Sequence, residues 1–223
     1  VTTFASFASM WLIPRLEAFQ REFPDIDIRI EASDTMLDLE VADVDLAVRY
    51  APVARVPTGA RRLFGESVTV MASPWLLKAG PALRRPADVL QYTLIESGDA
   101  YAPHLAWLSW HRWLEANDLA KQQPKRWLTL NYAYQMVQAA LTGQGLVLAR
   151  PPLVADALAR GELVELLPQT RLHSPLAYWL MLAPRSAARP EVKAFADWVL
   201  AQAVATRQVI GEGDDPDLVN DLD

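Results

Sequence analysis

The sequence predicts an α/β protein in which strands and helices alternate along the chain. Within residues 8–22, apolar side chains from Trp11 to Phe19 recur at the spacing of one helical face. Residues 26–30 then alternate isoleucine with charged side chains, and residues 44–50 form a second, more apolar strand-like run. The same alternation of patterns continues toward the C-terminus, which favours a largely parallel sheet covered by helices.

Prolines and glycines mark where individual elements begin and end. Pro14 lies in the first turns of the first helix, where proline is tolerated, and Pro24 closes that helix. Gly143 and Gly161 end two later helices. Helices are therefore expected at 8–22, 34–39, 74–79, 86–90, 104–116, 132–141, 152–159 and 191–203, and strands at 1–4, 26–30, 44–50, 68–72, 94–95, 127–130, 146–149, 163–166 and 176–182.

Large side chains in the tryptophan-rich helix separate into two faces. Trp107, Trp110 and Leu114 share one face, which favours packing in the core over an aromatic ligand cage. Trp113 lies off that face, so we expect it to be exposed. Arg62, in a pair of arginines, is expected to be solvated.

Composition restricts the class of protein. The 223 residues are 52% apolar and 22% charged, and no apolar run is long enough for a membrane span, so a soluble globular protein is expected. Without cysteine the chain forms no disulfide or thiolate site, which favours the cytoplasm. Six of the 27 acidic residues lie beyond residue 207, where there is no base. The remaining body is therefore neutral, with no basic footprint for nucleic acid, and residues 206–223 are expected to form a disordered acidic tail.

Two proline- and glycine-rich stretches suggest that the chain crosses twice between two lobes. They lie near residues 73–85 and 168–175. Lobe I is expected to comprise residues 1–75 with residues 175–205 returning to it, and lobe II residues 76–174. This topology is typical of a two-lobed clamp that holds a ligand between its lobes.

The sequence offers no catalytic or metal-binding motif. The three histidines, His104, His111 and His173, lack the spacing of metal ligands. No nucleophile elbow, zinc-protease motif or phosphate-binding loop occurs, and Gly143-Gln144-Gly145 lacks the third glycine of a dinucleotide fingerprint. We therefore expect no catalytic residues, no metal and no cofactor, and a protein that is not an enzyme.

A hydroxyl-rich turn and three later stretches carry a resemblance to a known family. They are Ser6 to Leu16, Phe23 to Ile26, Val44 to Tyr50 and Ala139 to Leu146. In this order the chain resembles the effector-binding domain of LysR-type transcriptional regulators, especially the glycine-cleavage-activator-like branch. The resemblance implies two Rossmann-like lobes of the type 2 periplasmic-binding-protein kind, joined by two crossover strands. It also implies a small-molecule effector between the lobes and no membrane partner. DNA would be bound only through an N-terminal winged helix-turn-helix that lies outside this sequence.

The family's binding positions, matched residue by residue, give a set of expected ligand contacts. In lobe I they are Ser6 and Ser9 in the first turn and Ser33 and Asp34 after the second strand; in lobe II they are Ser97, Tyr132 and Gln135, with Tyr178 near the return crossover. Some have a structural alternative: Ser6, Ser9, Ser33 and Asp34 also suit helix caps, and Tyr178 suits a buried strand. Tyr132 departs from the small hydroxyl residue of many relatives.

Two other functions share this fold. A solute-binding protein of a transporter would carry a secretory leader instead of a helix-turn-helix, and an enzyme would need catalytic residues that the sequence does not show. The resemblance further implies a homodimer, or a tetramer of the full-length protein. Candidate contacts between subunits are the helices at 10–22 and 152–160.

Overall fold

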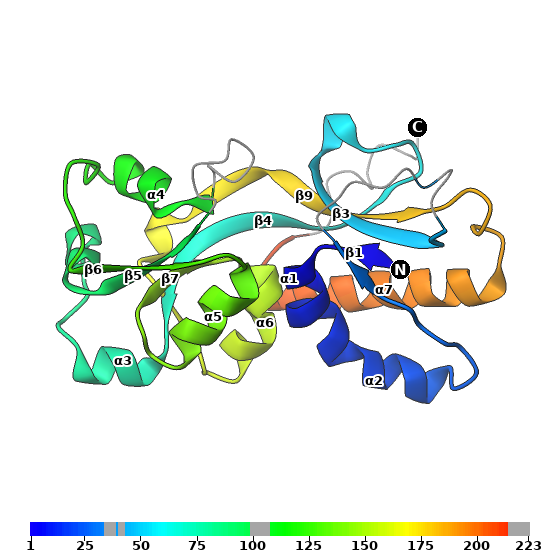
Figure 1. Ribbon diagram of the computed structural model, residues 1–223, viewed down its shortest axis with the longest axis horizontal. Coiled ribbons are helices and arrows are strands. Elements are labelled where there is room, and N and C mark those ends of the chain that lie inside the picture. The colour runs from blue at the N-terminus through cyan, green and yellow to red at the C-terminus, as the bar shows by residue number, and fades with distance from the viewer. Residues whose placement is uncertain (34–38, 40–42, 99–107, 214–223) are drawn as a thin grey trace.

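The computed structural model describes residues 1–33, 39, 43–98 and 108–213. Two lobes lie side by side, and the long strands β4 (Arg61–Ala72) and β9 (Leu172–Leu182) run from one to the other (Figure 1). The predicted α/β class, with two lobes and two crossover strands, is confirmed.

One continuous path of strands links the two lobes, in the order β2-β1-β3-β9-β4-β7-β5-β6, with β8 pairing beside β4. The outer strands pair in parallel, whereas β4 and β9 are antiparallel to each other and to their neighbours. The expected largely parallel sheet is therefore right only for the outer strands. The remaining strands are β1 (Thr2–Thr3), β2 (Glu31–Ala32), β3 (Leu46–Pro52), β5 (Thr93–Ser97), β6 (Arg126–Leu130), β7 (Leu146–Ala149) and β8 (Val164–Leu166).

The helices cover both lobes, and proline opens most of them. A proline in the first turn has no N–H to leave unpaired, which suits α2, α3, α6 and α7. The helices are α1 (Ala5–Phe7), α2 (Ile13–Glu22), α3 (Pro74–Ala79), α4 (Trp110–Ala116), α5 (Ala133–Leu141), α6 (Pro151–Ala159) and α7 (Pro190–Ile210), with 3₁₀ turns at Val53–Arg55, Pro86–Gln91 and Pro168–Thr170. Among the described residues, no helix combines the length and the apolar character that crossing a bilayer requires.

The first helix widens into a π-helical turn, Ala8–Leu12, between α1 and α2. The N–H of Ile13 donates to the carbonyl of Ala8, five residues back, and Pro14 then has no N–H to offer. The Arg15 guanidinium donates to the carbonyl of Trp11 over 2.9 Å. This wider turn carries Ser9 and Met10, which line a groove described below.

Each lobe has its own aromatic core. In lobe I, Phe7, Trp11 and Phe19 pack with residues of α7, and the Trp11 indole donates to Thr206 over 2.9 Å. In lobe II, Trp110 and Trp113 meet edge to face beneath α4. Helix α6 contacts both α7 and the π-helical turn, so it lies where the lobes meet (Figure 1).

Two sequence predictions about single elements are wrong. Residues 26–30 form no strand, because only Glu31 and Ala32 pair with β1; the isoleucines instead pack half-buried against the lobe I core. Trp113, expected to be exposed, is fully buried, and its indole donates to Thr170 over 3.2 Å. The face of a short helix is hard to assign when a second segment, here at Thr170, covers its far side.

The expectation of a disordered tail over residues 206–223 is also wrong for residues 206–212. Helix α7 continues through Ile210, because Thr206 faces the core and receives the Trp11 hydrogen bond. Glu212 is bound to β4, and Arg62, expected to be solvated, is mostly buried in an ion pair with it. Residues 214–223 lie outside the described residues.

Candidate functional site

A buried cluster of polar side chains lies where the crossover strands meet the lobes. Glu66 of β4 is fully buried, and the Tyr178 hydroxyl of β9 donates to its Oε1 over 2.5 Å. Arg150, directly before α6, brings its Nε to 3.2 Å from the same oxygen. The Arg150 guanidinium also stacks over the Tyr50 ring, and the hydroxyls of Tyr50 and Ser174 share a 2.7 Å hydrogen bond. We call these five residues the junction network.

The charges of the junction network hold its protons in place. Burial, reinforced by the charge of Glu66, raises the pKa of both Tyr178 and Tyr50 above the ordinary phenol value. Burial alone lowers the pKa of Arg150, but Glu66, Tyr178 and Tyr50 together outweigh it, so the pKa is raised. Both tyrosines therefore stay protonated, and Tyr178 donates to Glu66.

One acceptor in the junction network is unsatisfied. Among the described residues, the buried Oε2 of Glu66 finds no hydrogen-bond donor, although Oε1 accepts from Tyr178 and pairs with Arg150. Most buried polar atoms in native proteins are paired, so an exception inside an ion pair marks a place that a donor from outside the chain can complete.

The start of the first helix packs against the junction network. The Tyr178 ring lies within 6 Å, centre to centre, of Phe4 and Phe7. Ser6, between these two phenylalanines, is buried. Phe4 is the residue that precedes α1, and no side chain caps the helix there. The capping alternative therefore does not hold for Ser6 or Ser9.

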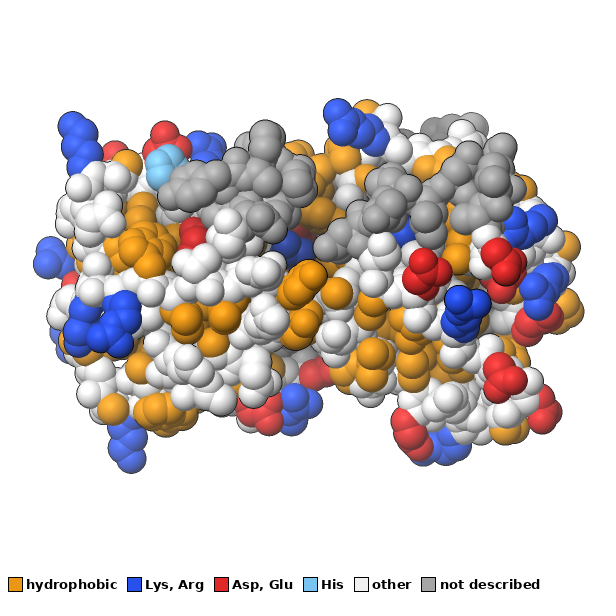
Figure 2. All heavy atoms as spheres, in the orientation of Figure 1, with side chains coloured by type: hydrophobic (Ala, Val, Ile, Leu, Met, Phe, Trp, Pro, Cys, Tyr) orange, Lys and Arg blue, Asp and Glu red, His pale blue; other side chains and the backbone are white. Residues whose placement is uncertain are grey.

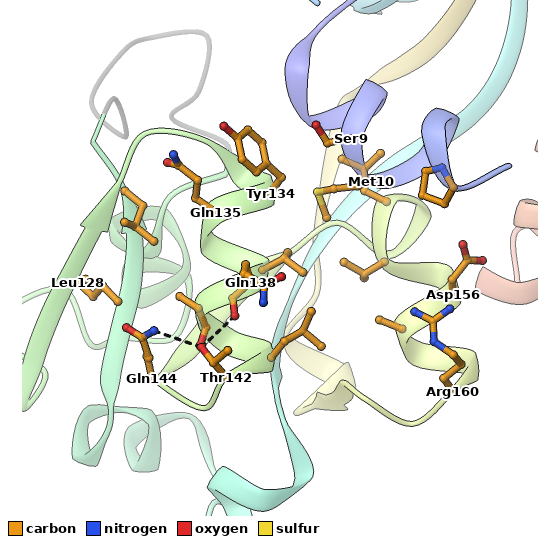
Figure 3. Close-up of a pocket in the computed structure, with 18 residues that line it drawn as sticks. Ser9, Met10, Leu128, Tyr134, Gln135, Gln138, Thr142, Gln144, Asp156 and Arg160 are labelled. Carbon is orange, nitrogen blue, oxygen red and sulfur yellow. Dashed lines mark hydrogen bonds between the residues drawn. The ribbon is translucent and has the colours of Figure 1, made fainter. Parts of the chain in front are cut away.

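A groove of about 720 Å³ runs between the lobes on another surface (Figure 3). Ser9, Met10 and Pro14 form the lobe I side, and α5 and β6 form the opposite side. At its end the Arg15 guanidinium pairs with Asp156 of α6 over 2.9 Å. We call this the interlobe groove. Its remaining lining residues are mainly apolar or uncharged polar side chains: Leu128, Leu130, Tyr134, Gln135, Val137, Gln138, Ala139, Leu141, Thr142, Gln144, Leu153, Val154, Ala157 and Arg160.

The predicted contact residues are divided between these two places. Ser9 and Gln135 line the interlobe groove, where Gln135 also accepts from the backbone N–H of Tyr132 and so caps α5. Tyr178 belongs to the junction network. It is buried on strand β9, the position that the sequence analysis gave as the alternative to a ligand contact. Tyr132 is 41% exposed and stacks on the neighbouring Tyr134.

The other predicted contacts lie outside the groove lining. The N–H of Ser33 donates to the carbonyl of Thr3, and the N–H of Ser97 donates to Glu96. Asp34 and His104 lie outside the described residues, as does Trp107. In the part of the chain that the structure describes, no three metal-binding side chains come together.

The sequence analysis missed Glu66 and Arg150. The signal was a single carboxylate within the run Leu63 to Ala72, and a single arginine between an apolar strand and two prolines. A charge within a buried strand needs a partner of opposite sign, but the sequence does not say that these two, 84 positions apart, are that pair.

A second, partly buried carboxylate, Glu96, lies at the end of β5 beside Ser97. Burial raises its pKa to about 7, although the N–H groups of Ser97 and Trp110 donate to it and lower the pKa in part. Unlike Glu66, it is held by backbone N–H groups.

Comparison with known proteins decides the family. A family model described as the LysR substrate binding domain matches residues 1–204. The chain belongs to the LysR substrate-binding domain family. The resemblance seen in the sequence is thereby confirmed, and so is the function class: an effector-binding domain of a LysR-type regulator.

Individual relatives agree with this family. The glycine cleavage system transcriptional activator of Escherichia coli is 32% identical over 212 residues, covering 93% of this chain and 66% of the relative. The activator AmpR of Pseudomonas aeruginosa is 31% identical, covering 89% and 63%. This chain thus spans just under two thirds of the length of these curated relatives.

Solved structures of LysR domains share the fold. The effector domain of Pseudomonas aeruginosa AmpR superposes with a TM-score of 0.66 at 29% identity, covering 94% of this chain and 96% of that one. The regulatory domain of CrgA from Neisseria meningitidis has a TM-score of 0.65 at 19% identity, with 91% and 96% covered. None of these relatives is a transport protein, so the transporter alternative gains no support.

Proposed function

We propose that this LysR domain binds a small polar effector between its lobes, against the junction network, within a longer cytoplasmic DNA-binding regulator. The observation that carries the proposal is the meeting of both lobes and both crossover strands at Glu66, whose second oxygen has no donor. A ligand that supplies this donor contacts the place where Arg150 of lobe II pairs with Glu66 and lies over the Tyr50 ring of lobe I.

Such a ligand acts by favouring one arrangement of the lobes. A binding event shifts a conformational equilibrium only when the ligand binds one state more tightly than the other. Because the Arg150–Glu66 pair joins residues on different lobes, a ligand that completes or replaces this pair senses their relative position. A linked DNA-binding domain then receives the change through the lobes to which it is attached.

A thermal-shift screen of this domain against amino acids, small carboxylates, aromatic acids and short peptides tests the proposal. A ligand at 100 times its dissociation constant stabilises the folded state by about 2.7 kcal/mol. We expect the shift to disappear in Tyr178→Phe and to shrink in Ser6→Ala. Tyr92→Phe is the matched control, because its hydroxyl donates to Pro81 in lobe II, outside the junction network. Equal shifts in all four proteins would place the ligand elsewhere.

A second proposal concerns the interlobe groove, which we assign to contact between two copies of the chain. Both helices expected at a subunit interface contribute to it, through Met10 and Pro14 on one side and Val154 and Ala157 on the other. Ile13, next to the groove lining, is 52% exposed. An open, largely apolar surface of this kind is typical of a protein interface.

Sedimentation of the domain at several concentrations tests the second proposal. We expect a dimer that dissociates in Gln138→Arg, because that variant adds a charge to an apolar contact. Gln122→Arg, on the exposed 3₁₀-like turn after α4, is the matched control and is expected to remain dimeric. A wild-type domain that is monomeric at all concentrations refutes the assignment for the isolated domain.

A further inference from the structure

The carboxylate of Glu212, which follows α7, is held by hydrogen bonds from two residues of β4. Both of its carboxylate oxygens accept from the backbone N–H of Gly65, at 3.0 and 3.1 Å, and Oε1 also accepts from Arg62 over 2.5 Å. Figure 1 shows the chain after α7 turning toward the crossover strands, where this contact is made. We call Arg62 and the N–H of Gly65 the carboxylate cradle.

The backbone of β4 is shaped to present this cradle. The pairing of β4 with β9 shifts register on each side of the Phe64–Gly65 step, so the strand bulges there. A Cβ on residue 65 would lie 2.6 Å from the Arg62 guanidinium and 3.3 Å from the Glu212 carboxylate. Glycine therefore lets an anion approach the backbone, as in other backbone sites for anions.

A cavity of about 440 Å³ adjoins the cradle and includes both of its residues in its walls. Two arginines, Arg62 and Arg171, line it together with His173 and two serines, Ser67 and Ser174. The carboxylate of Glu66 also belongs to the wall but is paired with Arg150. Arg171 is likewise paired with Glu165, so Arg62, the partner of Glu212, is the positive charge that an anion entering the cradle would meet.

We propose that the carboxylate cradle is a binding site for a small carboxylate, which Glu212 occupies from within the same chain. The site lies apart from the interlobe groove and shares none of the groove's lining residues. An external carboxylate displaces Glu212, takes the hydrogen bonds of Gly65 and Arg62, and extends into the cavity. Displacement removes the carboxylate contact between the chain after α7 and crossover strand β4, whereas Arg207 of α7 keeps its hydrogen bond to the Leu63 carbonyl.

Chemical rescue by free carboxylates tests this proposal. In Glu212→Ala the cradle lacks its internal carboxylate, so we expect acetate and succinate to raise the melting temperature by about 2–4 °C over sodium chloride at equal ionic strength. Succinamide, of the same shape without the charge, is expected to have no effect. Glu162→Ala is the matched control, because it breaks an exposed ion pair with Arg160 where no cradle exists.

The amide signal of Gly65 gives a readout that does not depend on stability. We expect acetate to shift this NMR signal in Glu212→Ala and in the isosteric Glu212→Gln, but not in the double variant with Arg62→Gln. In the wild-type domain the internal carboxylate competes, so the shift needs more acetate. If neither Glu212 variant responds in signal or in melting temperature, Glu212 is a structural ion pair only and the proposal is wrong.

Discussion

Two carboxylates, the buried Glu66 of the junction network and the partly buried Glu96 at the end of β5, have different kinds of partner. Glu66 faces the Arg150 guanidinium across the lobes and the Tyr178 phenol on the neighbouring crossover strand. Among the described residues, Glu96 accepts instead from the N–H groups of Ser97 and Trp110 within lobe II. The pKa of Glu96 is raised to about 7 by burial, so this carboxyl avoids a buried charge by holding its proton.

The two sites differ in how they stabilise a carboxyl group that folding removes from water. Inside lobe II the end of β5 and the start of α4 each supply one N–H donor to a carboxyl that is partly protonated. Between the lobes, the charge of Arg150 requires a charged partner, and Glu66 provides it from the crossover strand. The interlobe contact thus depends on an ion pair, and that dependence makes it sensitive to whatever binds beside it.

Removing the paired carboxylate should have the largest effect. Glu66→Ala leaves Arg150 buried without its partner and Tyr178 without its acceptor, so we expect a loss of about 3–5 kcal/mol in unfolding free energy. Urea denaturation followed by tryptophan fluorescence measures it. Glu162→Ala, at an exposed pair, should lose no more than about 0.5 kcal/mol. A small loss in Glu66→Ala would mean that the junction network does not hold the lobes together.

Removing the unpaired carboxylate should change the pH dependence. The folded chain keeps the Glu96 proton up to about pH 7, whereas the ordinary pKa of an exposed glutamate carboxyl is 4.5. Between these values the folded state binds more protons, so its stability falls as pH rises. From pH 5 to pH 8 we expect the wild type to lose roughly 2 kcal/mol more than Glu96→Gln.

Urea denaturation at both pH values measures this difference, with Glu22→Gln on the exposed end of α2 as the control. The control should follow the wild-type curve. Identical curves for wild type and Glu96→Gln would mean that Glu96 is already ionised at pH 5 in the folded domain.

Loss of the Tyr178 hydroxyl should show how much each of the two partners of Glu66 contributes to stability. Tyr178→Phe keeps the ring packing against Phe4 and Phe7 and the ion pair with Arg150, but removes the donor to Glu66. We expect a cost of about 1–3 kcal/mol in unfolding free energy, smaller than that of Glu66→Ala. Equal costs for the two variants would make the phenol, and not the arginine, the main partner.

The periodic features of this fold were predictable, and the partners of its isolated charges were not. The helix of residues 151–159 and the strand of residues 146–149 follow from proline position and an apolar run, which are local. Tyr178 was named as a ligand contact through its matched position near the return crossover, and that role stays a prediction. Glu66, Arg150 and Glu212 were missed, because each is paired only by the register of β4 against distant segments.

The same dependence on distant partners explains why the end of α7 was predicted wrongly. The acidic composition beyond residue 207 suggested a disordered tail, but a single carboxylate that meets Arg62 and Gly65 is enough to fix the chain through residue 212. Composition averages over neighbours in the sequence, whereas binding depends on neighbours in space.

The ion pair at the end of the interlobe groove should have the smallest effect. Arg15 and Asp156 also join residues of different lobes, but the Asp156 side chain is 43% exposed, so water and salt screen the pair. We expect Asp156→Asn to cost no more than about 1 kcal/mol in urea denaturation, and the cost to vanish at high salt. Glu66→Ala should keep its cost under the same salt, because its pair is shielded from solvent. If salt removed both costs equally, burial would not be what separates the junction network from the groove.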